Sequence, residues 1–233
     1  EMTSSLVGSE MCIRDSGKVY PIQKTQDGSV VYLEGIPSKG WKVFSRVSEM
    51  TDSEKKSPIT ITEHGVDTPF YHAELDENGL FTSIYDKEFD REIIREGQKG
   101  NLIRMYEDKP MNYDNWDIDM YYTEKSWDVT GVDDMRWVEN GPVRAALQIT
   151  RSVSNSKIFQ TICFYADSRR IDFETKIDWK ESQHLLKVHF PMDVHSDEAA
   201  FDIQFGNVTR KIHTNTSSVS YTHLRAHETR RHL

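Results

Sequence analysis

The sequence predicts an all-β protein dominated by one large antiparallel β-sandwich. Apolar and polar residues alternate with a period of two in several segments, turn-forming residues separate these segments, and no apolar stripe of helical spacing exceeds two turns. Short strands that follow one another with polar turns between them are typical of antiparallel sheets packed face to face. We therefore predict a sandwich over residues 60–217, preceded by part of a small β-domain over residues 17–47.

The first strands are expected before the sandwich begins. Trp41, Val43 and Val47 alternate with polar residues, and residues 17–47 contain three expected strands, too few for a stable domain. The run Ser48–Pro58 has little apolar content and is rich in Ser, Glu and Lys, a composition that predicts a linker over residues 48–59.

Turn residues divide the sandwich into short strands. Asn78-Gly79 is a strong hairpin signal, because both residues tolerate a positive φ, and it joins strands expected at residues 71–75 and 80–85. Alternation predicts further strands at residues 143–150, 171–178, 184–190 and 201–205.

The composition is that of a folded, acidic protein. Its 233 residues include 29 Lys and Arg against 38 Asp and Glu, a net charge of −9 that argues against a nucleic-acid partner. The 10 Phe, 10 Tyr and 5 Trp favour a packed core. No long apolar run or secretory signal is visible, so we expect no membrane partner. Two cysteines, Cys12 and Cys163, predict no disulfide framework and suit the cytoplasm.

Both ends of the chain differ from its interior. The chain begins at Glu1 rather than Met, which suggests a fragment, and residues 1–16 show no periodicity. Residues 218–233 are rich in His and Arg and have no apolar pattern. We interpret both segments as non-native, adapter-derived sequence, with ordinary disordered tails as the alternative, and we exclude them from the fold prediction. The histidines of the tail therefore predict no metal site.

The most informative segment is Asn112–Tyr122, which contains four aromatic residues and three aspartates. Aromatic faces stack on the C–H groups of sugars, and carboxylates accept hydrogen bonds from their hydroxyls. The candidate substrate-binding residues are Trp116, Asp117, Asp119 and Tyr121. On a strand the two aspartates would share a face roughly 6.5–7 Å apart and could hold a pair of hydroxyls or a cation. The alternative is an edge strand and loop whose aromatics pack and whose acids confer solubility.

The remaining motifs predict no catalytic residue and no metal ligand. Nucleophile-elbow, P-loop and dinucleotide-binding fingerprints are absent. The histidines outside the tail lack the spacing of paired zinc ligands. We interpret His184 as a buried, hydrogen-bonded histidine and expect His189 to point the opposite way, toward solvent or a partner domain.

Besides Trp116–Asp119, four separated segments are informative together, namely Tyr85–Glu88, Ala166–Ser168, Ile171–Thr175 and Leu185–Val188. In this order they resemble segments of the glycoside hydrolase family 38 α-mannosidases. The resemblance covers about residues 17–217, and motifs that recur in one order are more specific than a single match. The resemblance implies a sandwich of the galactose-mutarotase-like type, which forms the last portion of a modular enzyme.

The resemblance also implies what this chain lacks. In the family, a zinc ion and the nucleophilic aspartate belong to the N-terminal domains, and no position here matches those motifs. The intact parent is expected to be a zinc-dependent, retaining α-mannosidase acting on mannose-containing oligosaccharides. The chain alone is expected to be inactive, to lack a cofactor of its own, and to pack on the missing N-terminal catalytic domain. Trp116, Asp117, Asp119 and Tyr121 are expected to border the catalytic cleft.

Two other functions remain open from the sequence. One is a stand-alone carbohydrate-binding sandwich that uses the Trp116 region. The other is a mutarotase-like or epimerase-like sugar enzyme, which would need a histidine and a glutamate facing each other in a cleft. His184 with Glu174 or Glu181 is the candidate pair.

Overall fold

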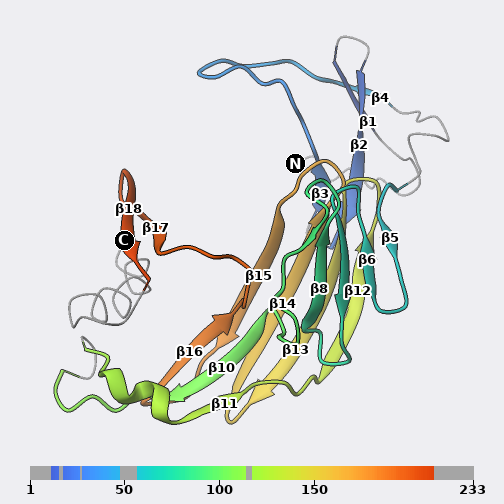
Figure 1. Cartoon of the computed structure of the whole chain (residues 1–233). Helices are drawn as coiled ribbons and strands as arrows, with labels where there is room; N and C mark the ends of the chain where they lie inside the picture. The colour runs from blue at the N-terminus through green and yellow to red at the C-terminus, as the bar shows by residue number, and fades with distance from the viewer. Residues whose placement is uncertain (1–11, 16–17, 27, 48–56, 114–116, 213–233) are drawn as a thin grey trace, which may run out of the picture.

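The protein is built almost entirely from antiparallel strands, which confirms the predicted all-β fold class (Figure 1). The computed structural model describes residues 12–15, 18–26, 28–47, 57–113 and 117–212, and only the backbone of residues 12–15, 46 and 47. Within these residues the one helical segment is a short 3-10 helix, η1 (Met120–Glu124). No helix there has the length and apolar character of a membrane span.

A small antiparallel sheet of four strands precedes the sandwich. Its order is β3-β2-β1-β4, with β1 (Cys12–Asp15), β2 (Lys18–Thr25), β3 (Gly28–Val31) and β4 (Ser45–Val47). Strand β1 belongs to the segment interpreted as adapter-derived, and the origin of that segment stays a prediction. Trp41 and Val43 lie outside β4 and are 81 % and 66 % exposed, so the strand expected there forms only at its end.

Two layers of antiparallel sheet form the sandwich (Figure 1). One layer is a meander in the order β12-β13-β14-β15, with β12 (Asp134–Asn140), β13 (Arg144–Val153), β14 (Ser156–Tyr165) and β15 (Ile171–Asp178). The other layer consists of two smaller sheets. The five-stranded sheet runs β5-β6-β7-β8-β9, with β5 (Thr60–Ile61), β6 (Gly65–Asp67), β7 (Tyr71–Leu75), β8 (Phe81–Asp86) and β9 (Arg91–Glu92). The three-stranded sheet runs β11-β10-β16, with β11 (Ser126–Asp128), β10 (Leu102–Glu107) and β16 (His184–His189).

Two apolar clusters hold the layers together, one under each smaller sheet. In the first, Phe81 of the five-stranded sheet packs with Leu147 and Ile162 of the meander, and all three are nearly or fully buried. In the second, Ile103 of β10 packs with Ile158 of β14. Because β13 and β14 extend under both clusters, these two long strands set the position of the smaller sheets.

Buried polar side chains connect the two clusters. Arg151 of β13 is 1 % exposed, and its guanidinium donates to the carbonyl of Asn78 and to two carbonyls in the β11–β12 connection. On β14, Gln160 exchanges hydrogen bonds of 2.7 and 3.2 Å with the side chain of Asn101. A buried polar group left without a partner costs about 1–3 kcal/mol, so these bonds favour a single arrangement of the sheets.

One buried amide joins the small sheet to the sandwich. Gln23 of β2 is 6 % exposed, and its Nε2 donates to Glu139 and to the carbonyl of Arg144 at 3.1 and 2.9 Å. Its Oε1 accepts the backbone N–H groups of Val143 and Arg144 at 3.0 and 2.9 Å. Ile59, the last residue of the predicted linker, is 3 % exposed within the first apolar cluster. Packing against the sandwich therefore begins before residue 60.

The last two strands, β17 (Glu198–Ile203) and β18 (Gly206–Lys211), form a hairpin that stands apart from the sandwich in Figure 1. The predicted strand at residues 201–205 is wrong at its end. Because Ile203 pairs with Gly206, Gln204 and Phe205 form the turn, and Phe205 takes a φ of 64° with its side chain fully exposed.

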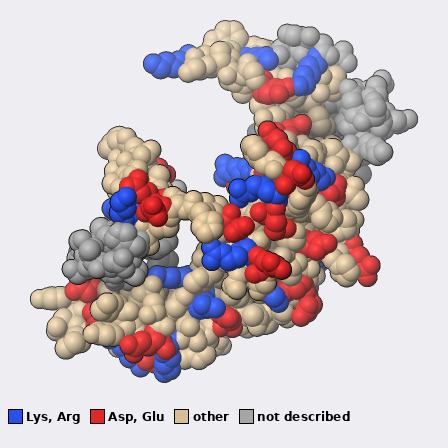
Figure 2. Space-filling view, in the orientation of Figure 1, with Lys and Arg blue, Asp and Glu red and all other residues tan. Residues whose placement is uncertain are grey.

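Charged side chains of both signs intermingle over the face of the sandwich shown in Figure 2. Ion pairs among the described residues include Lys99 with Asp76 at 2.7 Å and Arg104 with Asp128 at 2.5 Å. This distribution is that of a solvated surface with no broad basic patch on the face in view.

Candidate functional site

The aromatic and acidic segment singled out in the sequence lies between β10 and β11. Trp116 is outside the described residues. Asp117 and Asp119 are half-buried, and the N–H of Asp117 donates to the carbonyl of Tyr113 at 3.0 Å. Asp119 directly precedes η1, and its Oδ2 accepts the N–H of Met111 at 3.0 Å. The strand assumed for the two aspartates is therefore wrong, because these bonds turn the chain back into a loop.

The end of this segment is anchored on the three-stranded sheet. Lys187 of β16 donates from Nζ to the hydroxyl of Tyr122 at 2.6 Å, and Nζ lies 4.3 Å from the centroid of that ring. Tyr122 also packs edge-on against Tyr106 of β10, with ring centroids 5.2 Å apart. These contacts hold η1 on the sheet and leave its Tyr121 accessible, with 64 % of the residue exposed.

The two histidines of β16 lie on opposite faces of the strand, as the alternation predicts. His184 is half-buried, packs near Trp127 with ring centroids 5.8 Å apart, and places Nδ1 2.6 Å from the carbonyl oxygen of Ser182. His189 places Nε2 2.7 Å from the hydroxyl of Tyr106. Burial lowers the pKa of His189, and nearby positive charges act in the same direction. His189 is therefore neutral at pH 7 and contributes to the sheet as a hydrogen-bonding group.

His184 does not pair with either candidate glutamate in the described part of the chain. Glu181 Oε1 accepts the Oγ–H of Ser156 at 2.8 Å and the N–H of Asn155 at 2.7 Å, and these bonds lower the pKa of Glu181. Glu174 lies on β15 opposite β14. Glu181 therefore fixes the β13–β14 turn, and the histidine–glutamate pair of a mutarotase-like site is not assembled around His184.

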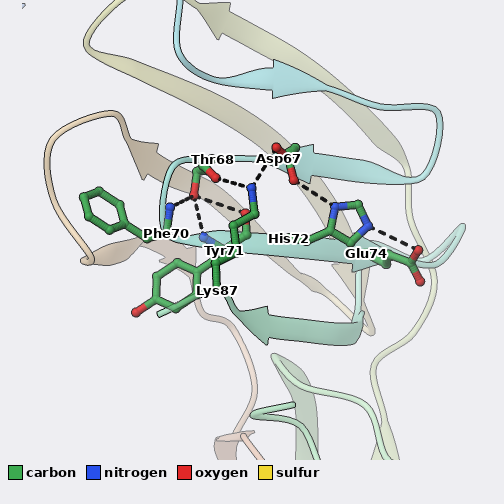
Figure 3. Close-up of polar contacts among 7 residues, drawn as sticks. All are labelled: Asp67, Thr68, Phe70, Tyr71, His72, Glu74 and Lys87. Carbon is green, nitrogen blue, oxygen red and sulfur yellow. Dashed lines mark hydrogen bonds and ion pairs between the residues drawn. The ribbon is translucent and has the colours of Figure 1, made fainter. Parts of the chain in front are cut away.

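A histidine between two carboxylates does occur, on the surface of the five-stranded sheet (Figure 3). His72 of β7 lies with Nδ1 3.1 Å from Asp67 Oδ1 and with Nε2 3.5 Å from Glu74 Oε1. Lys87 donates from Nζ to Asp67 Oδ2 at 2.8 Å and to the carbonyl of Thr68 at 2.7 Å. Burial raises the pKa of Asp67, but the hydrogen bonds from Lys87 and His72 outweigh it and the pKa is lowered.

This charged cluster has a structural role rather than a catalytic one. It connects β6, β7 and the turn after β8, and the side chains of Asp67, His72 and Glu74 remain 41–51 % exposed. Sequence reasoning missed it, although His72-x-Glu74 on one strand face and a tight turn after Asp67 are visible signals. The proximity of these side chains becomes evident only once Asp67 and His72 are known to be paired residues of β6 and β7.

Cavities open on the described surface. One of about 280 Å³ lies between the small sheet and the sandwich. Another, of about 330 Å³, opens at the sandwich edge and combines Trp137 with Glu63, Asp76 and Glu77. None of the described residues predicted to bind substrate lines either cavity. The sequence did not predict the residues that line the sandwich-edge cavity, because they come from strands and turns that only the tertiary fold brings together.

Comparison with known families identifies the larger part of the chain. Residues 66–223 match the model described as "Glycosyl hydrolases family 38 C-terminal domain". Alpha-mannosidase G of Dictyostelium discoideum is 28 % identical over 216 residues, which cover 84 % of this chain and 20 % of that protein. Alpha-mannosidase 2C1 of Mus musculus is 32 % identical over 79 % of this chain and 18 % of that protein. The chain thus spans about a fifth of the length of these relatives.

A solved structure supports the fold independently. The crystal structure of an alpha-mannosidase from Enterococcus faecalis V583 superposes with a TM-score of 0.66 at 16 % identity. The match covers 91 % of this chain and 29 % of that one. The chain therefore belongs to glycosyl hydrolase family 38, with residues 66–223 in its C-terminal domain.

Proposed function

We propose that this chain is the C-terminal β-region of a retaining, zinc-dependent α-mannosidase that cleaves mannose from mannose-containing oligosaccharides. The family match over residues 66–223 carries this proposal, supported by curated relatives that are themselves alpha-mannosidases. Because the chain spans about a fifth of those relatives, the nucleophile is assigned to the rest of the parent enzyme. The chain alone should therefore hydrolyse no mannoside.

Zinc in the parent belongs to the same proposal. A protein zinc site needs three or four converging His, Cys, Asp or Glu ligands. The described residues contain no group of three or more such side chains placed to hold a metal ion, so they do not fit zinc. The contribution of this chain is accordingly confined to packing and to substrate binding.

The substrate contacts are proposed for the loop and helix of the aromatic and acidic segment, namely Trp116, Asp117, Asp119 and Tyr121. One oxygen of Asp119 closes the loop, which leaves the other to accept a sugar hydroxyl. Tyr121 is accessible beside it in the chain and offers a ring face for stacking. The anchoring of Tyr122 by Lys187 supports this assignment, because a binding group must be held in place to contribute affinity.

The proposed partner is the N-terminal catalytic domain of the same parent chain. Met192, Val194, Ile203 and Phe205, in and before the terminal hairpin, are each at least 46 % exposed. Exposed apolar groups of this kind are typical of surfaces that pack on another domain. A cytoplasmic location completes the proposal and is supported by Cys163, a buried free thiol.

The substrate-binding assignment is tested in the parent enzyme. Asp117→Ala and Asp119→Ala should each lower kcat/KM for 4-nitrophenyl α-D-mannopyranoside at least about tenfold, a loss of about 1.4 kcal/mol in transition-state binding. Asp134→Ala, which removes an exposed aspartate of β12, is the matched control and should leave kcat/KM unchanged. Unchanged kinetics in both test variants would remove the two aspartates from the site. A parent without mannosidase activity would instead favour a carbohydrate-binding sandwich.

A further inference from the structure

The cavity of about 330 Å³ at the sandwich edge combines apolar and acidic lining residues. It opens where edge strand β12 faces the β5–β6 turn and the β7–β8 hairpin. Its volume lies at the small end of the range for ligand pockets, about 300–1,000 Å³, and suits a single sugar ring.

The apolar wall of the cavity is held by the core. Trp137 and Leu147 are paired residues of β12 and β13, and Met135 lies two residues before Trp137 on the same face. The ring of Trp137 is half-buried and packs near Phe164, with centroids 6.1 Å apart. A fixed indole flanked by aliphatic side chains is suited to the C–H face of a pyranose.

The opposite wall presents a fixed, ionised acceptor. The side chain of Asp76 is 8 % exposed, and its Oδ1 accepts the N–H groups of Asn78 and Leu80, both at 2.9 Å. Its Oδ2 accepts Lys99 Nζ at 2.7 Å. Burial acts to raise the pKa of Asp76, but the hydrogen bonds from Lys99, Leu80 and Asn78 outweigh it and the pKa is lowered. Four lone-pair positions with three bonds leave one position for a ligand hydroxyl.

Two further carboxylates lie on the rim. Glu63 is 88 % exposed, and Glu77 is exposed beside Asn78 in the hairpin. The turn that carries Glu63 is held against the hairpin strand by a bond of 2.7 Å from the N–H of Leu75 to the carbonyl of His64. Both carboxylates therefore line the cavity from the five-stranded sheet and can accept hydroxyl hydrogen bonds.

The charge balance favours a neutral polyhydroxyl ligand over a cation. Lys99 offsets the charge of Asp76, and the guanidinium of the buried Arg151 acts on the same carboxylate. The remaining charges, on Glu63 and Glu77, are well solvated and attract a cation only weakly. Hydroxyl groups lose less hydration energy than an ammonium when they enter such a site.

We propose that this cavity binds one pyranose unit of a mannosidic glycan, with the sugar ring on Trp137 and its hydroxyls hydrogen-bonded to Asp76, Glu63 and Glu77. The choice of mannose rests on the proposed function. The site is separate from the segment of Asp117 and Asp119 and would give the enzyme a second contact with the same class of substrate.

Fluorine NMR of the 233-residue chain labelled with 5-fluorotryptophan tests this directly, because its 5 Trp residues each give a resonance. Trp137→Phe assigns the resonance of Trp137. Titration with methyl α-D-mannopyranoside to about 100 mM should shift that resonance and saturate with a Kd on the order of 10 mM. The resonance of Trp41, which is 81 % exposed and lies outside the cavity, should not move.

The double variant Glu63→Gln/Glu77→Gln should weaken the binding at least about fivefold, since an amide is a poorer acceptor than a carboxylate. Glu96→Gln, which alters an exposed glutamate outside the cavity, is the control and should retain the Kd. A Trp137 resonance that does not move, an unchanged Kd in the double variant, or a shift with tetramethylammonium chloride but not with the mannoside would each overturn the proposal. This test measures binding alone, so an inactive parent enzyme would refute the proposed function without deciding the cavity.

Discussion

Replacement of Gln23 by alanine should loosen the contact between the small sheet and the sandwich. The substitution removes all four hydrogen bonds made by this amide and leaves the backbone N–H groups of Val143 and Arg144 without this acceptor, whereas the carbonyl of Arg144 keeps its bond of 3.2 Å from the N–H of Gly141. At about 1 kcal/mol for each of the two N–H groups, the low end for sites that water can reach, the loss is about 2 kcal/mol. That corresponds to about a thirtyfold change in the local opening equilibrium.

Amide hydrogen exchange followed by NMR measures this opening. The N–H groups of Val143 and Arg144 should exchange about thirtyfold faster in Gln23→Ala, whereas Gln26→Ala, at an exposed glutamine of the same sheet region, should change nothing. Gly141→Ala should act like Gln23→Ala, because a Cβ there would lie 2.4 Å from Gln23 Cδ. Equal exchange rates in Gln23→Ala and Gln26→Ala would refute the role given to this amide.

Three other outcomes follow from the core and from the hairpin. Phe81→Ala should lower the free energy of unfolding, measured by urea titration, by about 3–5 kcal/mol, because Phe81 is fully buried between Phe164 and Phe173. Phe205→Ala, at an exposed turn, should change the free energy of unfolding by less than about 0.5 kcal/mol. Because the pKa of Asp76 is lowered, its ionised form stabilises the fold at pH values above the ordinary pKa of 3.8, and this contribution is lost as the pH falls through the folded-state pKa. Asp76→Asn should therefore lack that part of the acid unfolding transition. Identical acid unfolding profiles of the variant and the unsubstituted chain would contradict the assignment. Burial raises the pKa of Cys163 to about 11, so this thiol should react with Ellman's reagent only after unfolding when Cys12 is replaced by Ser. Rapid labelling of the folded Cys12→Ser chain would contradict the burial of Cys163.

Local patterns predicted the strands well where one face of the strand meets the core. The Asn78-Gly79 hairpin forms as expected, with Gly79 at a φ of 66°, and the strand predicted at residues 171–178 is β15 (Ile171–Asp178). Alternation fails to predict burial at the edges: Ile177 lies on the expected dry face yet is 42 % exposed, because β15 is an edge strand of its sheet.

Features that depend on distant pairing could not be predicted. The division of the second layer into two sheets rests on β10 pairing with β16, and no local signal specifies that partner. The loop of Asp117 and Asp119 takes its shape from bonds to Met111 and Tyr113 rather than from its own alternation. The residues of the sandwich-edge cavity likewise meet only when β12 faces the β7–β8 hairpin.

The central claim is that this chain is the non-catalytic β-region of a family 38 mannosidase. Its most direct test is the rate at which the purified 233-residue chain releases 4-nitrophenol from 4-nitrophenyl α-D-mannopyranoside in buffer containing zinc, beside the parent enzyme from the extended reading frame. We expect turnover by the parent and a rate equal to the buffer blank for the chain alone. The account would be contradicted if the chain alone turned the mannoside over and if substitutions in the chain itself abolished that turnover.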